Sequence, residues 1–203
     1  MQKYIFYIKL LTYLVGRLSF SVDSVKAFCT RGIKKDPRNY HARFLLAELE
    51  RSEGNNKLAI EGYEALLNYG FRNLNVLHGL AMASFKEQMY DESQKYFEMI
   101  LESEPSDKAA LDHLGRINLV KKEYHEAIRC FKQSLRIDPR NPLILENMAY
   151  CYYNIEDYHK SYEAYRAALE LDPNSEHLEK YMNLAKSELE KYGASRKGTL
   201  AHD

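Results

Sequence analysis

The sequence predicts an all-α protein built from stacked pairs of antiparallel helices, and three periodic features predict it. The 203 residues keep a period of 34 without an insertion. Apolar residues within each period follow helical spacing, and proline and helix-capping residues recur at fixed places. Units of this kind cannot bury their apolar faces alone and must stack on their neighbours. The pattern therefore predicts a solenoid of helical repeats.

Four columns of residues carry the period. The first pairs a large apolar residue with a small one, the second holds small residues, the third holds aromatic residues and the fourth is mostly proline. Their members, each one period after the last, are Leu46-Ala47, Leu80-Ala81, Leu114-Gly115 and Met148-Ala149; Ala59, Ser93, Ala127 and Ser161; Tyr63, Phe97, Phe131 and Tyr165; and Pro37, Phe71, Pro105, Pro139 and Pro173. Small residues facing large ones let helices pack closely and fill the space between units.

Two helices can be followed within one unit. Leu145, Met148, Ala149 and Tyr152 have the i, i+3, i+4, i+7 spacing of a helical stripe, which the polar residues 154–157 end. A second stripe consists of Tyr158, Ser161, Tyr165, Ala168 and Leu169. An N-cap residue, whose side chain can accept from first-turn amides, opens each helix pair. These caps are Asn39, Asn73, Asp107, Asn141 and Ser175.

The four columns and their spacing resemble the tetratricopeptide repeat, whose unit is a pair of helices. Tyr90, Tyr124 and Tyr158 also match the tyrosine that opens its second helix, whereas Asn56 departs there. The early aromatic of the family is replaced by Arg43, Leu77, Leu111 and Leu145, and Phe71 replaces one proline. The resemblance implies a right-handed superhelical solenoid of antiparallel helix pairs, without catalytic activity, that binds protein segments on its concave surface.

The period predicts where the units lie. We expect repeats at 40–73, 74–107, 108–141 and 142–175, a capping helix at 176–192 and a disordered tail at 193–203. Leu178, Met182, Ala185 and Leu189 give the capping helix one apolar face, with charged residues elsewhere. A terminal repeat needs such a polar outer face for solubility.

Two interpretations are open for residues 1–39. Residues 4–20 are strongly apolar, but Lys9 and Arg17 interrupt a run already shorter than the ~20 residues that cross a bilayer. Val22, Val25, Cys29, Gly32 and Pro37 fall on columns of the later repeats. We therefore expect a degenerate first repeat, in which the apolar segment is the first helix. The alternative is a membrane-associating helix at the interface, followed by the second helix of the repeat.

Composition and motifs exclude several classes of function. Lys+Arg and Asp+Glu both number 29, and this neutral balance disfavours nucleic-acid binding, which needs a basic excess. The three cysteines have no paired or metal-ligand spacing, so we expect buried thiols, no cofactor and no metal. No catalytic motif is present, and we expect no enzyme. A cytoplasmic protein is expected, with membrane association as the alternative.

The resemblance also implies a binding groove, because the family lines its concave surface with first-helix residues that lie off the packing stripe. The candidate groove residues are Phe44, Glu48, His78, Met82, Phe85, Asp112, Arg116, Glu146, Tyr150 and Tyr153. Leu143 is a further position of the same surface. Aromatic, Met and charged residues of both signs suit a peptide or helix that is anchored by apolar side chains and oriented by polar ones.

Two specialised binding modes of the family do not fit these residues. A carboxylate clamp would need lysine, asparagine and arginine, but Asp112, Arg116, His177 and Tyr181 stand at four of its positions and only Asn147 matches. A ladder of asparagines that holds an extended chain would need one asparagine in every repeat, and only Asn147 is present at these positions. We expect a scaffold, adaptor or chaperone-like module for a protein or peptide segment; the alternative is a membrane-associated assembly or secretion factor anchored through residues 4–20.

Overall fold

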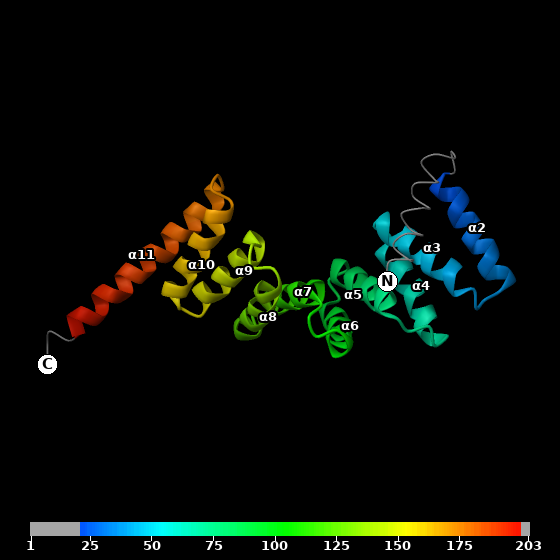
Figure 1. Ribbon diagram of the computed structural model, residues 1–203, viewed down its shortest axis with the longest axis horizontal. Coiled ribbons are helices and arrows are strands. Elements are labelled where there is room, and N and C mark those ends of the chain that lie inside the picture. The colour runs from blue at the N-terminus through cyan, green and yellow to red at the C-terminus, as the bar shows by residue number, and fades with distance from the viewer. Residues whose placement is uncertain (1–20, 200–203) are drawn as a thin grey trace. The chain divides into compact units, whose positions relative to one another are not determined.

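The structure, a computed structural model, describes the backbone of residues 21–199 and the side chains as far as residue 191. This part of the chain forms helices and no strands (Figure 1), so the all-α helical-repeat fold is confirmed. The helices are α2 (Val22–Lys35), α3 (Tyr40–Ser52), α4 (Asn56–Asn68), α5 (Leu74–Lys86), α6 (Tyr90–Ser103), α7 (Lys108–Val120), α8 (Tyr124–Ile137), α9 (Pro142–Asn154), α10 (Tyr158–Leu171) and α11 (Glu176–Thr199).

The helices keep the period of the sequence. The even-numbered helices begin one period apart, from Val22 to Tyr158, and the odd-numbered helices do the same from Tyr40 to Glu176. All of the expected capping residues accept a hydrogen bond from the backbone N–H three residues later. The distances are 3.1 Å for Asn39, 2.9 Å for Asn73, 2.8 Å for Asp107, 3.3 Å for Asn141 and 3.4 Å for Ser175. Side-chain caps thus fix where each first helix begins.

A left-handed residue closes the first helix of each of the four repeats that begin at α3, α5, α7 and α9. The residues are Gly54, Gln88, Lys122 and Glu156, with φ of 85°, 60°, 62° and 61°. After α7, the N–H of Glu123 donates to the carbonyl of Asn118 at 2.8 Å and that of Lys122 to Leu119 at 3.0 Å. These two bonds form a Schellman motif, which satisfies the last carbonyls of the helix. The chain therefore reverses at the same point in every repeat.

The chain divides into two compact units, residues 1–100 and 101–203, which are described separately. In the first unit α2 packs on α3, α3 on α4 and α4 on α5. Its core contains the fully buried side chains of Tyr63, Leu66, Val76 and Leu80. Each consecutive helix therefore covers the apolar face of the one before it.

In the second unit the helices from α7 to α11 pack in chain order. One core cluster is built around Phe131, Ile144 and Cys151. A second cluster joins α9 and α10 to α11 through Tyr165 and Leu178. The two cysteines of this unit, Cys130 and Cys151, are buried free thiols, as the sequence predicts.

Small residues allow these helices to approach closely. A Cβ added to Gly79 of α5 would collide with the ring of Tyr63 on α4, and one added to Gly115 of α7 with the ring of Phe131 on α8. At Gly62 of α4, an added Cβ would lie only 2.9 Å from the Cβ of Ala47 on α3. Each close approach therefore depends on a residue with little or no side chain on one of the two helices.

Serine replaces alanine in the small column without leaving a buried hydroxyl unpaired. Ser93 donates to the carbonyl of Ala81 at 2.8 Å, and Ser161 donates to that of Ala149 at 2.9 Å. Both bonds join the second helix of a repeat to the first helix of the same repeat. Because a buried hydroxyl is costly without a partner, these bonds explain why the column accepts either residue.

The expectations for the C-terminal end need correction. The capping helix was expected at 176–192 and a disordered tail at 193–203, but α11 continues to Thr199. The end of apolar periodicity near Gly193 predicts a helix end there. A glycine costs a helix only about 1 kcal/mol relative to alanine, and no proline follows it. The expectations for residues 1–20 and 200–203 lie outside the described residues.

The left-handed turn positions generate a stability prediction. Lys122→Gly should raise the melting temperature by about 2–4 °C, because a side chain in this region costs roughly 1 kcal/mol and glycine does not. Gly54→Ala should lower it by a similar amount. Thermal unfolding followed by circular dichroism measures both.

The control is the preceding residue, Lys121, which has an ordinary φ of −74°. Lys121→Gly should lower the melting temperature, since glycine there only adds chain entropy to the unfolded state. A rise for Lys121→Gly, or a fall for Lys122→Gly, would contradict the assignment of strain to Lys122.

Candidate functional site

The candidate groove residues of the first unit lie on α3 and α5, two first helices that contact each other. Phe44 is half-buried, packs against the core cluster and has its ring centroid 6.1 Å from that of Tyr63. His78, Met82 and Phe85 on α5 are also half-buried. Phe85 makes an edge contact with Tyr90, with centroids 5.8 Å apart. These side chains support the fold as well as line its surface.

Glu48 belongs to a polar network. Its carboxylate accepts a hydrogen bond from the hydroxyl of Tyr63 and another from Arg51, at 2.7 Å. Burial and then the charge of Glu48 raise the pKa of Tyr63, so the phenol stays neutral and donates. The hydrogen bond to Glu48 raises the pKa of Arg51, which stays charged. Glu48 therefore ties α3 to α4.

Asp112 has the same kind of role in the second unit. It accepts from the buried hydroxyl of Ser134 on α8 and from Lys108 at 2.9 Å. Lys108 also approaches Asp138 at 3.5 Å. The carboxylate is thus already bound by a hydroxyl and an ammonium group. Arg116, one turn further along α7, is half-buried.

Glu146 links α9 to α11. Its carboxylate lies 2.8 Å from Nε2 of His177, whose ring is 4.7 Å from that of Tyr181. Tyr181 in turn stacks on Tyr165, with centroids 5.9 Å apart. Burial, followed by the charge of Glu146, raises the pKa of Tyr165. This mixed polar and aromatic cluster forms one border of the exposed face of α9.

That exposed face, here the α9 surface, consists of Leu143, Tyr150 and Tyr153. Leu143 is 55% exposed and Tyr150 42%. Tyr150 is supported from one side by Tyr124, whose ring centroid is 6.5 Å away. Tyr153 is half-buried against Tyr158 at 5.4 Å. Of the ten candidate groove residues, Tyr150 is the one that is largely exposed.

Comparison with known proteins identifies the family. Models of the tetratricopeptide repeat match residues 22–72, 109–141 and 142–175. The chain belongs to the tetratricopeptide-repeat family. The unmatched stretch between these matches includes α5 and α6, which keep the same period. No curated protein sequence matches the chain.

Solved structures share the tetratricopeptide fold at low identity. A crystal structure of YrrB, described as a TPR protein with an unusual peptide-binding site, is 19% identical, with a TM-score of 0.75 over 89% of this chain and 90% of that one. A crystal structure of MamA is 16% identical, with a TM-score of 0.71 over 77% and 92%. MamA from Desulfovibrio magneticus RS-1, residue 41 to its end, is 12% identical, with a TM-score of 0.72 over 84% and 96%. At these identities the likeness shows the fold alone.

Two further observations concern the described part of this tetratricopeptide-repeat chain. Within the described residues, no three His, Cys, Asp or Glu side chains are placed to hold a metal ion. Among the helices of the same part of the chain, none is both long and apolar enough to cross a bilayer.

The sequence did not single out two exposed apolar residues. Leu143 was one position among many of the predicted surface, and its exposure makes it as prominent as Tyr150. Phe28 on α2 was not considered, although it is 69% exposed. Its column continues with Gly62, Tyr96 and Cys130, so the size of the side chain at this position varies. This variation within a repeat column is the signal in the sequence that could have pointed to Phe28.

The Glu48 network predicts a coupled loss of stability. Tyr63→Phe keeps the ring, which the column accepts at Phe97 and Phe131, but removes the hydroxyl. It should cost about 1 kcal/mol, and Glu48→Ala should cost a similar amount. Chemical denaturation of the two single variants and the double variant measures the coupling.

The two effects should not add. Once Glu48 is gone, Tyr63→Phe should cost clearly less than it does in the native chain, because the two groups share one hydrogen bond. Additive losses would mean that the carboxylate and the phenol act independently and that Glu48 is available for other contacts.

Proposed function

We propose that the chain is a non-catalytic interaction scaffold that binds a peptide or amphipathic helix of another protein on the α9 surface. The observation that carries this proposal is the joint exposure of Leu143 and Tyr150 on one helix. They are seven residues apart, which places them two turns apart on the same face. A partner helix or extended segment with two apolar anchors at a matching distance would cover both.

The magnitudes indicate how much of the surface a partner must use. Complete burial of one large apolar side chain contributes about 1.5–3 kcal/mol. A micromolar complex needs about 8 kcal/mol. Leu143 and Tyr150 alone therefore do not suffice, and the partner also contacts the half-buried Tyr153 and polar groups at the border of the surface.

The polar border favours particular partner chemistry. Asp112 and Glu146 are both committed to neighbours within the second unit, so neither is a free acceptor for a basic partner. Lys180, an exposed residue on α11 with its ammonium group 5.9 Å from the ring of Tyr181, is a cation beside His177 and Tyr181. An apolar segment that carries an acidic group at one end suits this arrangement.

The family and its relatives support binding of this kind. Tetratricopeptide repeats present first-helix side chains to protein partners, and the YrrB structure is described as having a peptide-binding site. Within the second unit, Arg116 extends the proposed binding role to α7. In the first unit, Phe44, His78, Met82 and Phe85 form a separate candidate surface on α3 and α5. The partner is a protein segment rather than nucleic acid, and the compartment that fits three buried free thiols is the cytoplasm.

A second candidate function rests on residues 4–20. Their apolar character favours a membrane-associated assembly or secretion factor, in which this segment lies in the bilayer interface. Flotation of the full chain with lipid vesicles separates the two functions. Binding to vesicles that is lost when Leu10 and Leu14 are replaced by Asp would favour membrane association; a chain that stays at the bottom of the gradient would exclude it.

The α9 surface predicts a selective loss of binding. Leu143→Ser with Tyr150→Ser should reduce partner recovery at least about tenfold, since about 1.4 kcal/mol of lost contact corresponds to that factor. Quantitative mass spectrometry of proteins captured from a cell extract by immobilised chain measures the recovery. Binding of the recovered partner to the purified chain then confirms direct contact.

The matched control removes apolar side chains of equal exposure elsewhere in the second unit. Val120 is 48% exposed and Ile137 45%, and neither lies on α9. Val120→Ser with Ile137→Ser should leave partner recovery unchanged, and both double variants should melt within a few degrees of the native chain. Equal loss in the two variants, or none in the α9 variant, would contradict the proposed surface.

A further inference from the structure

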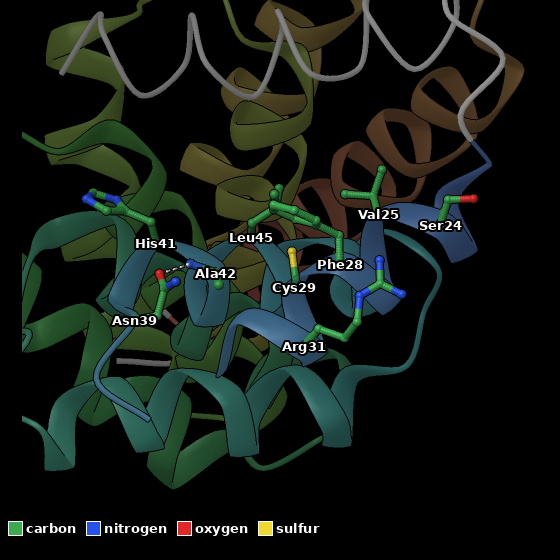
Figure 2. Close-up of a pocket in the computed structure, with 9 residues that line it drawn as sticks. All are labelled: Ser24, Val25, Phe28, Cys29, Arg31, Asn39, His41, Ala42 and Leu45. Atoms are coloured by element: carbon green, nitrogen blue, oxygen red, sulfur yellow. Dashed lines mark hydrogen bonds between the residues drawn. The ribbon is translucent and has the colours of Figure 1, made fainter. Parts of the chain in front are cut away.

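An apolar groove lies between α2 and α3 in the first unit. It has a volume of about 510 Å³, and Figure 2 shows side chains of both helices around it. Val25, Phe28 and Cys29 come from α2, and Ala42 and Leu45 come from α3. Phe28 is the most exposed large apolar side chain among the described residues. An exposed apolar face of this kind on a surface helix marks a place where another element can dock.

The repeat register shows what covers the equivalent faces elsewhere. The junction of α2 with α3 corresponds to that of α4 with α5, one period later, and to that of α8 with α9, two periods after that. At Gly62, the counterpart of Phe28, α4 is covered by α3 through Ala47. At Phe131, a counterpart of Cys29, α8 is covered by α7 through Gly115. In both cases the covering element is the first helix of the same repeat.

The same register assigns a covering segment to the groove. α3 spans Tyr40–Ser52, so the equivalent first helix is residues 6–18. Residues 53–55 join α3 to α4, and residues 19–21 would make the equivalent connection to α2. A connection of three residues spans at most about 10 Å, which keeps the end of a preceding helix near the start of α2. The groove is therefore within reach of this segment and at the place where the period puts it.

At the groove, the large and the small side chain of a repeat have changed places between the first and the second helix. Elsewhere a large ring on the second helix meets a small residue on the first, as Phe131 meets Gly115. On α2 the ring is replaced by Cys29, and the matching position of residues 6–18 holds Tyr13 in place of alanine or glycine. One period later than Leu45 stands Gly79, where the ring of Tyr63 leaves no room for a side chain. Leucine fits at the earlier position because Cys29 is smaller than that ring. The ring column is thus interrupted at the buried Cys29, and the small-residue position that faces it in the register holds the ring of Tyr13 instead.

The two basic residues of the apolar segment stand at positions where the next repeat also has basic residues. Lys9 corresponds to Arg43 and Arg17 to Arg51, both basic residues on the first helix of the next repeat. Arg43 donates to the carbonyl of Pro37 at 2.8 Å and lies over the ring of Tyr69. Arg51 pairs with Glu48. First helices of this chain therefore accept basic residues at these two positions while they pack on their neighbours.

We propose that residues 6–18 of this chain occupy the groove between α2 and α3, with Tyr13 over Cys29. The segment then completes a fifth helix pair rather than serving as an anchor. This inference concerns the first unit and is independent of the α9 surface.

Disulfide formation in the full chain tests this placement. The register puts Tyr13 opposite Phe28, as Ala47 is opposite Gly62. Tyr13→Cys with Phe28→Cys, in a chain that also carries Cys29→Ala, should form an intramolecular disulfide, whose Cβ atoms need a separation of about 3.5–4.5 Å. Cys130 and Cys151 do not compete, because both are buried and burial raises the pKa of Cys151 to about 12. Oxidised glutathione is the oxidant, and peptide mapping identifies the bond.

The control pair moves the first thiol away from α2. Tyr7 is about 9 Å from Tyr13 along a helix, and its later counterparts, from His41 to Leu143, are exposed or half-buried. Tyr7→Cys with Phe28→Cys should give at least about tenfold less disulfide. Disulfide-linked dimers would show that a second copy fills the groove, and equal yields from both pairs would show that the segment is not held there. Either result overturns the proposal.

A second measurement, on a variant that retains Tyr13, tests the placement if the Tyr13→Cys chain fails to fold. Phe28→Cys, again with Cys29→Ala, retains Tyr13, and its thiol should react with a maleimide about tenfold more slowly than that of Leu58→Cys in the same background. Leu58 is 52% exposed on α4 and serves as the open reference. Equal rates for the two thiols would mean that the groove is open and the placement is wrong.

Discussion

The spacing of the helices depends on aromatic rings of second helices that pack against small residues of first helices. The rings of Tyr63 and Phe131 leave no room for a Cβ on Gly79 and Gly115. Both rings are completely buried, so the contact fixes the distance between helix axes as well as the core.

Carboxylates of the first helices show how polar residues are adapted to this packing. Glu48 binds the hydroxyl of Tyr63, Asp112 binds that of Ser134, and Glu146 binds His177. Each of these bonds reaches a helix further along the chain. Residues that a groove would offer to a ligand are therefore partly used for folding. In the second unit, α9 exposes two large apolar side chains, Leu143 and Tyr150, whereas Val120, Ile137 and Leu184 are exposed singly on α7, α8 and α11.

The sequence was sufficient for the parts of the fold that depend on periodicity. Helix starts, caps and buried columns follow from residues such as Asn73 and Phe131, because every repeat must solve the same packing problem. The pairing of Glu48 with Tyr63 could not be predicted, since an off-stripe carboxylate can face either solvent or a neighbouring helix. The extent of α11 was also missed, because propensity alone sustains a helix after its apolar pattern ends. Exposure of Leu143 depends on local packing, which periodicity leaves undetermined.

The terminal helices of the described chain differ in the faces that they leave exposed. α11 buries Leu178 and Ala185 and exposes charged residues, as the last helix of a solenoid should. α2 instead leaves Phe28 exposed beside Val25. A helix with that face does not meet the solubility requirement of a terminal element, so α2 has the character of an internal helix. The exchange of ring and small residue at Cys29 and Leu45 then has a consequence for specificity. In the placement proposed above, alanine or glycine in place of Tyr13 would remove the ring from the groove, and the lost contacts would weaken the packing of the segment.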